Sequence, residues 1–293
     1  MFEHRFALFL TVLIFCLLLV GGFVHNMGAS LACPDWPTCH GTLMPEMTGG
    51  VAIEHSHRLL ASAVGIFTIV LAVLLAKKRS EDRGLVRLGF LGVLLVIFQG
   101  VLGGITVLFK LPPIVSIAHL GTSMIFFAVV IVIAWRTKPI PTTGLRGEQG
   151  RGEVGLAILF TYFQILLGAV VRHTHSGLVC PDIPFCHGFI WPWGMGYMTA
   201  LHMAHRWIGV ILAVLICRLT LTLWKEAPQM VRRLLLLATG IVFCQIALGI
   251  LSVLTLLGVP AVTAHLGGAA LLWATMVSLW IHRDQKKNLG NPL

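Results

Sequence analysis

The stretch LACPDWPTCHGTL at residues 31–43 occurs a second time, as LVCPDIPFCHGFI at residues 178–190. The two copies share the pattern CPDxPxCHG and lie 147 residues apart in a chain of 293 residues, so each half of the chain carries one copy. A repeat of this kind indicates that one structural unit is encoded twice. The repeat therefore predicts the same fold for both halves.

Between the two copies the chain is strongly apolar. Hydrophobic residues make up 57% of it and charged residues only 11%, too few for a soluble domain to cover its surface. A helix needs about 20 mostly apolar residues to cross a bilayer. We predict eight such helices, at residues 6–25, 53–76, 87–109, 115–135, 154–172, 199–224, 234–257 and 262–282.

The net charge of +10 does not indicate a nucleic-acid partner, because the positions of the basic residues follow the expected membrane topology. Of the 21 lysines and arginines, 17 lie near the N-terminus, at 77–87, at 136–151, from the end of the sixth span to Arg233, or in the C-terminal tail. By the positive-inside rule, both termini are predicted to be cytoplasmic. Both CPDxPxCHG loops are then expected on the outer, periplasmic or extracellular face of the cell membrane, with the lipid bilayer as partner.

The two halves align at a nearly constant offset of 146 to 148 residues. Each half holds four predicted spans, an even number, so the halves share one orientation. We predict an all-α membrane protein of two parallel-oriented four-helix bundles, related by a pseudo-two-fold axis along the membrane normal. The aligned pairs are Gly21 and Gly168, Cys33 and Cys180, Cys39 and Cys186, His57 and His205, Gln99 and Gln245, Gly103 and Gly249, and His119 and His265.

The domain limits follow from this duplication. We predict an N-terminal half at 1–137, a polar, Pro/Gly-rich cytoplasmic linker at 138–152, a C-terminal half at 153–285 and a cytoplasmic tail at 286–293. A secretory signal cleaved after Ala32 is the alternative for the first span. We favour a retained helix, because its apolar run is longer than that of a signal peptide and it matches the fifth span.

Four of the seven cysteines lie in the two repeated loops. A pair spaced C-x5-C on an oxidising outer face can close a short ring, which predicts the disulfides Cys33–Cys39 and Cys180–Cys186. The alternative is a metal site, in which the cysteines bind together with the histidine that follows each pair.

Four histidines lie a few residues past the outer start of the second, fourth, sixth and eighth spans: His57, His119, His205 and His265. Ionisable side chains inside spans are costly and indicate function. Two imidazoles from separate helices of a bundle suit a low-spin heme, whereas zinc would need further ligands. We therefore predict one heme in each half.

An arginine directly follows one ligand candidate in each half, Arg58 after His57 and Arg206 after His205. Both lie near the outer face, against the general charge bias. We expect them to pair with heme propionates. The alternative is that they extend to lipid headgroups.

The halves differ three residues before these ligands, where Glu54 stands in the first half and His202 in the second. Glu54 shares a helix face with His57. We interpret it as a carboxylate that takes a proton from a reacting substrate or stabilises positive charge on it. Alternatively, it forms an ion pair with Arg58, one turn further along.

Other polar residues near the spans are expected to make structural contacts. His55 and His202 are predicted to form hydrogen bonds at the membrane interface, while His173 and His175 have no predicted role. Three spans carry a glutamine four residues before a glycine. We expect each glutamine to form one interhelical hydrogen bond, with a contact to a prosthetic group as the alternative; they are Gln99, Gln164 and Gln245.

Together these motifs resemble those of the heme A synthase family. The resemblance rests on the duplicated four-span halves, the tied cysteine pair, the E-x-x-H-R motif at 54–58 and the AHLG motifs at 118–121 and 264–267, and it covers residues 1–285. It implies an oxidoreductase that converts the C8 methyl group of heme O to a formyl group by successive hydroxylations and loss of water. The product would be heme A for cytochrome oxidases.

The same resemblance implies roles for the site residues. His57 and His119 would flank the substrate heme O, His205 and His265 would hold a permanent heme B, and Glu54 would be the catalytic carboxylate. The first cysteine pair would support activity. Implied partners are a heme O synthase, cytochrome oxidase assembly factors and an unidentified electron carrier. Whether the protein forms a homo-oligomer is left open.

Two other classes of membrane protein fit part of the pattern. A diheme membrane cytochrome b that transfers electrons between quinol and an external partner would use the same four histidines, but it leaves Glu54 without a reason. A transporter built from parallel repeats would need neither paired histidines nor disulfide-closed loops over them.

Overall fold

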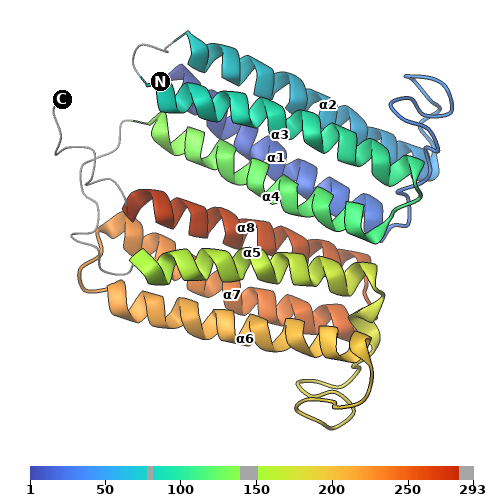
Figure 1. Cartoon of the computed structure of the whole chain (residues 1–293), viewed down its shortest axis with the longest axis vertical. Coiled ribbons are helices and arrows are strands. Elements are labelled where there is room, and N and C mark those ends of the chain that lie inside the picture. The colour runs from blue at the N-terminus through green and yellow to red at the C-terminus, as the bar shows by residue number, and fades with distance from the viewer. Residues whose placement is uncertain (78–81, 139–150, 284–293) are drawn as a thin grey trace. The chain divides into compact units, whose positions relative to one another are not determined.

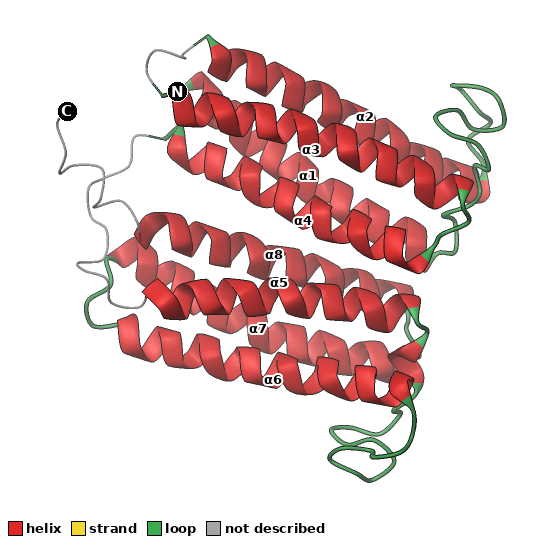
Figure 2. Cartoon of the chain, in the orientation of Figure 1, coloured by secondary structure: helices red, strands yellow, loops and turns green. Residues whose placement is uncertain are grey.

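The computed structural model of the chain describes residues 1–77, 82–138 and 151–283. Figure 2 shows that this part is built of helices joined by loops and turns. The helices are α1 (Phe2–Asn26), α2 (Gly49–Ala76), α3 (Arg83–Leu108), α4 (Pro113–Arg136), α5 (Arg151–His173), the short 3₁₀ helix η1 (Ser176–Leu178), α6 (Tyr197–Leu223), α7 (Gln229–Leu254) and α8 (Val259–Arg283).

Within the described residues, eight helices are long and apolar enough to cross a membrane, which confirms the predicted spans and the all-helical fold class. Large apolar side chains cover the outside of the helices. Leu94 on α3 and Ile66 on α2, for example, are 65% and 60% exposed. Such surfaces are unfavourable in water and suit a lipid environment, so the chain is a multi-pass membrane protein.

The described chain divides into two compact units, of which the first comprises Met1–Lys138 together with Val262–Gly267. In this unit α1 packs against α2 and α4, and α3 also packs against α2 and α4. The four helices therefore close into a ring, as Figure 1 shows for the bundle drawn in blue to green. The loop between α1 and α2 protrudes from the end where α2 and α4 begin.

The second unit contains the other described residues and has its own core. Val154 of α5, Leu212 of α6, Leu235 of α7 and Met276 of α8 are all buried in one apolar cluster. Close packing of such side chains against one another helps to hold the four helices together. The predicted linker 138–152 lies largely, and the tail 286–293 wholly, outside the described residues, so these limits stay predictions, as do the pseudo-two-fold axis and the cytoplasmic termini.

The turns after α3 and α7 show that the duplication extends to the backbone. The N–H of Leu111 donates to the carbonyl of Thr106 at 2.7 Å, and the N–H of Leu257 donates to the carbonyl of Ser252 at the same distance. In each turn two consecutive non-glycine residues have positive φ values, which is rare. The sequences LFKLPP at 108–113 and LTLLGV at 254–259 thus form the same local turn with different side chains.

Candidate functional site

Both repeated loops are closed by disulfides. Cys33 and Cys39 are joined with an S–S distance of 2.01 Å, and Cys180 and Cys186 with one of 2.04 Å. All four cysteines are fully buried. The disulfide prediction is therefore confirmed for both loops.

The histidine that follows each cysteine pair holds the loop. His40 Nε2–H donates to the carbonyl of Ala32 at 3.0 Å, and His187 Nε2–H donates to the carbonyl of Val179 at the same distance. The two imidazoles thus brace equivalent points of the two loops. The structure shows no joint metal site of these histidines with the cysteines, since the sulfurs are already paired.

An aspartate organises the turn in each loop. Asp35 accepts hydrogen bonds from the Thr38 hydroxyl and from the N–H groups of Gly41 at 2.9 Å and His40 at 2.6 Å. These bonds, the Thr38 hydroxyl first, lower the pKa of Asp35 from 3.8 to about 2. In the second loop the N–H groups of Gly188 and His187 lower the pKa of Asp182.

Arg58 fastens the first loop to α2. Its Nη1 donates to the carbonyls of Asp35 at 2.7 Å and Thr38 at 2.5 Å, and its Nη2 donates to the carbonyl of Cys33 at 3.0 Å. The planar guanidinium suits such a set of converging acceptors. The structure thus gives Arg58 a loop-binding contact that the sequence did not indicate, and propionate binding stays a prediction.

Glu54 completes this arrangement from the same helix. Its Oε1 lies 2.5 Å from Arg58 Nη2, and its Oε2 accepts a hydrogen bond from the Cys33 N–H at 2.8 Å. The residue is 3% exposed. The ion pair offered by the alternative interpretation is therefore present, and the catalytic role stays a prediction.

The second loop is fastened in the same way, with one difference. Arg206 Nη1 donates to the carbonyls of Asp182 and Phe185, both at 2.7 Å, and Nη2 donates to the carbonyl of Cys180 at 2.5 Å. In place of a carboxylate, His202 Nε2 accepts a hydrogen bond of 3.3 Å from Arg206 Nε. The hydrogen bond predicted for His202 is thus confirmed.

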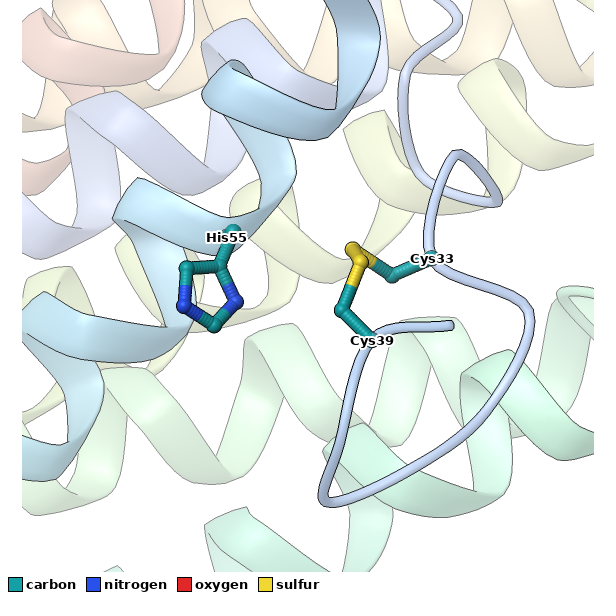
Figure 3. Close-up of side chains that lie close together, drawn as sticks. All are labelled: Cys33, Cys39 and His55. Carbon is teal, nitrogen blue, oxygen red and sulfur yellow. A yellow bond between two sulfur atoms is a disulfide. The ribbon is translucent and has the colours of Figure 1, made fainter. Parts of the chain in front are cut away.

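The prediction of a hydrogen bond for His55 is wrong. His55 is 4% exposed, and neither ring nitrogen has a hydrogen-bond partner within the described residues. The ring lies against the Cys33–Cys39 disulfide, with ligand atoms of all three residues within 4.8 Å of one another (Figure 3). Nothing in the sequence placed the His55 ring beside the sulfurs.

The imidazoles of the first unit pack against glycines. His57 Cε1 lies 3.0 Å from the position that a Cβ would take at Gly21 of α1, and His119 Cε1 lies 3.6 Å from that position at Gly103 of α3. A side chain at Gly21 would displace the His57 ring.

The second unit repeats this contact. His205 Cε1 lies 3.0 Å from the Cβ position of Gly168 on α5, the same distance as in the first unit. His265 lies on α8 near its start, in the segment Val262–Gly267 that groups with the first unit, and its pairing with His205 stays a prediction. The signal for these glycine contacts was present in the sequence, because Gly21 and Gly168 align between the halves.

Two of the three glutamines form the expected interhelical hydrogen bonds. The carbonyl oxygen of Gln99 on α3 accepts a hydrogen bond of 2.9 Å from the Ser123 hydroxyl on α4. Gln164 Nε2 on α5 donates to the carbonyl of His205 on α6 at 2.8 Å. For Gln245 the prediction stays open: its Nε2 is buried without a partner within the described residues.

The residues of the first unit fit a heme. His57 and His119 come from two different helices of one bundle, and the Nδ1 atom of each is buried without a hydrogen bond in the described chain. Within the described residues, no hydrogen bond to Nδ1 therefore fixes either ring in another role. Paired imidazoles from separate helices are suited to bind a heme iron from both sides.

Comparison with known proteins identifies the family. The chain matches the model of a family described as cytochrome oxidase assembly protein at residues 4–51 and 47–277. It is 31% identical to the heme A synthase of Lysinibacillus sphaericus over 277 residues, which cover 89% of this chain and 88% of that protein. The corresponding enzymes of Symbiobacterium thermophilum and Shewanella oneidensis are 29% and 27% identical, over 91% and 94% of this chain and 90% and 94% of theirs. The chain therefore belongs to the heme A synthase family of cytochrome oxidase assembly proteins.

Proposed function

We propose that this protein acts in heme A biosynthesis as an oxidoreductase that converts the C8 methyl group of heme O to the formyl group of heme A. The observation that carries the proposal is the pair of half-buried imidazoles, His57 and His119, near a buried carboxylate, Glu54, that the second half lacks. Family membership supports it, because the relatives are named heme A synthase.

In this proposal the first unit receives the substrate. His57 and His119 would hold the iron of heme O, and Gly21 and Gly103 leave the space in which the two rings lie. A side chain at Gly21 would tilt the His57 ring and so misplace the methyl group that must be oxidised. Orientation of this kind accounts for a large share of catalytic power in many enzymes.

Glu54 would take up the proton released as the hydroxylated carbon is oxidised further. A carboxylate has about four lone-pair sites. Two are used by Arg58 and the Cys33 N–H, so each oxygen keeps capacity for a substrate proton. The same two contacts would hold the carboxylate in one orientation during the transfer.

The C-terminal half, residues 153–285, would serve as a permanent cofactor site. His205 and His265 would hold a heme B, which supplies one-electron transfer when bound. Gly168 gives the His205 ring the same close contact that Gly21 gives His57. Because His202 replaces the carboxylate in this half, the second unit lacks the proposed proton acceptor.

The proposal includes a cellular setting. The protein would lie in the cell membrane with both disulfide loops on the outer face, following the distribution of its basic residues. A heme O synthase would supply the substrate, an electron carrier would accept electrons, and cytochrome oxidase assembly factors would receive the product. The diheme quinol cytochrome considered from the sequence gains no support from these relatives.

The test is conversion of heme O in a host that makes no heme A of its own. The protein is co-expressed with a heme O synthase, and the extracted hemes are separated by chromatography and identified by mass. We expect heme A, or its hydroxylated precursor, together with heme B. Heme B alone, with heme O left unchanged, would overturn the proposal.

A matched pair of variants tests the role of Glu54. Glu54→Gln keeps the size of the side chain and removes its basicity, so heme should stay bound while oxidation falls by at least about 100-fold, the lower range for general acid–base catalysis. His202→Gln changes the aligned position of the other half and should keep oxidation. Full activity of Glu54→Gln would remove this carboxylate from the mechanism.

A further inference from the structure

We propose that Gln164 is a positioning residue that fixes the proposed iron ligand His205 to α5, so that the C-terminal half retains its heme, whereas His57 lacks this bond and the N-terminal half can exchange its heme. The inference rests on the proposed function, in which one site takes up heme O and releases heme A while the other keeps heme B. Two aligned positions carry the difference, and they hold Gln164 and Gly209 in the C-terminal half and Leu17 and Ala61 in the N-terminal half.

Two residues of α5, one helical turn apart, contact His205 on α6. Gly168 lies against the ring, because its Cβ position is 3.0 Å from Cε1 of the imidazole. Gln164 Nε2 donates a hydrogen bond of 2.8 Å to the backbone carbonyl of the same histidine. One contact thus restrains the side chain of the ligand and the other restrains its backbone, which together hold the imidazole in one position relative to α5.

Gly209 makes the His205 carbonyl accessible to this amide. In an α-helix the carbonyl of residue i points toward the N–H of residue i+4, which for His205 is Gly209. A Cβ at Gly209 would lie 3.2 Å from Gln164 Nε2, so a larger residue would press the amide away from the carbonyl. Since a carbonyl oxygen has two lone pairs, it can accept from Gln164 in addition to its helical partner.

The N-terminal half keeps the ring contact and differs in the backbone contact. Gly21 of α1 lies against the ring of His57, also at 3.0 Å. One turn before this glycine, the residue aligned with Gln164 is Leu17, whose side chain has no donor. Four residues after His57 stands Ala61, whose Cβ occupies the space that glycine leaves open in the other half. Leu17 therefore cannot bind the His57 carbonyl to α1.

The other proposed ligand of the first site is supported from a neighbouring helix. Ser123 stands four residues after His119 on α4, and its hydroxyl lies 2.6 Å from the His119 carbonyl and 2.9 Å from Oε1 of Gln99 on α3. α3 and α4 are thus joined beside His119. His57 is therefore the ligand that we expect to move away from the iron when the heme is exchanged.

The hydrogen bond of Gln164 opposes the same movement in the C-terminal half. Gln164 and His205 lie within membrane-spanning helices. Little water is present there to replace the bond if α5 and α6 separate, so the amide would be left without a partner. Because the ligand must leave the iron before the heme can leave the protein, this bond slows the loss of heme from the C-terminal half.

The test measures how fast each site releases heme B. The full-length protein is expressed in a host without heme O synthase, so that heme B is the heme available to both sites. Each site is studied alone, in a protein whose other site is disabled by His57→Ala or His205→Ala. Excess apomyoglobin takes up the released heme, and absorption spectroscopy follows the transfer. The measurement needs no heme O conversion.

We expect the C-terminal site to release heme B more slowly than the N-terminal site. Gln164→Leu combined with Gly209→Ala, which copies the first half, should speed release from the C-terminal site about threefold to tenfold, the effect of one interhelical hydrogen bond in a membrane. The reciprocal pair, Leu17→Gln with Ala61→Gly, should slow release from the N-terminal site by a similar factor. Because this pair lies in the other unit, it keeps the test decisive if the first pair fails to fold.

Thr239→Val is the matched control for a merely structural effect. It removes the contact of 2.9 Å between the hydroxyls of Thr220 on α6 and Thr239 on α7, about four helical turns beyond His205. The electron paramagnetic resonance spectrum of the oxidised heme B reports the geometry of its ligands. It should change in Gln164→Leu and stay unchanged in Thr239→Val.

Two results would overturn the inference and leave the proposed function in place. One is unchanged release of heme B in both reciprocal pairs, and the other is the same acceleration in Thr239→Val as in Gln164→Leu. A C-terminal site that binds no heme in the absence of these substitutions would overturn the inference together with the proposed cofactor site. The two kinds of failure are therefore distinguishable.

Discussion

The backbone N–H of Cys33 donates a hydrogen bond of 2.8 Å to the buried carboxylate of Glu54. This bond links the disulfide loop to the residue proposed as the catalytic carboxylate. Since Arg58 contacts both the carboxylate and three loop carbonyls, loop and carboxylate form one hydrogen-bonded unit. Members of such a network support one another, so removing one is expected to disturb the others.

Arg58→Ala should destabilise the protein strongly. The substitution leaves the Glu54 carboxylate buried without its cation, and breaking a buried ion pair in this way costs about 3 kcal/mol or more. Unfolding of the purified protein in a denaturing detergent measures the effect. The double variant Glu54→Ala with Arg58→Ala should lose less than the sum of the two single variants, and additive losses would show that the pair is not coupled.

Gly21→Ala should impair heme binding in the first unit. The new Cβ would lie 3.0 Å from His57 Cε1, closer than normal packing allows, so the imidazole must move. Gly103→Ala is the matched control, because its Cβ would lie at an ordinary 3.6 Å from His119 Cε1. Heme content and the absorption spectrum of the purified variants check this, and equal loss in both would show that the close contact is not the cause.

Gly168→Ala applies the same test to the second unit. Its Cβ would also lie 3.0 Å from a histidine ring, that of His205. We expect selective loss of the heme B proposed for the C-terminal half, while the proposed substrate site keeps its heme. Retention of heme B at the wild-type level would contradict the proposed role of His205.

Asp35→Asn should remove part of the acid sensitivity of the first loop. The pKa of Asp35 is about 2 in the fold, against an ordinary 3.8. A lowered pKa contributes stability that is fully present above the ordinary value and is lost as the pH falls from about 4 to about 2. The difference in melting temperature between wild type and Asp35→Asn should therefore shrink over that interval, whereas a constant difference would contradict the assigned cause.

Asp82→Ala should destabilise α3 by about 1 kcal/mol, because Asp82 caps the helix by accepting hydrogen bonds from the N–H groups of Gly84 and Leu85. Asp82→Asn separates this effect from the exposed ion pair with Arg136 at 2.9 Å. An asparagine still caps, and exposed ion pairs contribute little. Unfolding in a denaturing detergent should show a larger loss of stability for Asp82→Ala than for Asp82→Asn. Equal losses of stability would assign the effect to the ion pair.

Much of the fold could be predicted, because its signals are local. A span is set by about 20 apolar residues in a row, and a short disulfide ring by two cysteines in one loop. The candidate ligand histidines stood out because an ionisable residue in a span is rare and each recurs in the other half at a nearly constant offset, 148 residues for His57 and 146 for His119. The side-chain contacts of the site carried no such signal. Arg58 binds backbone carbonyls, which every loop residue has, so no residue type in the loop predicts the contact.

The sequence by itself determined the eight spans, the duplication, the two cysteine pairs and the candidate iron ligands, since each depends on residue type, spacing or run length alone. Only the tertiary structure decided that Glu54 pairs with Arg58 and the Cys33 N–H, and that the His55 ring lies against the first disulfide. The physical reason is that these contacts depend on how a loop folds back over the start of a helix. The direction of a side chain there is set by packing and by backbone hydrogen bonds, and neither is encoded by spacing along the chain.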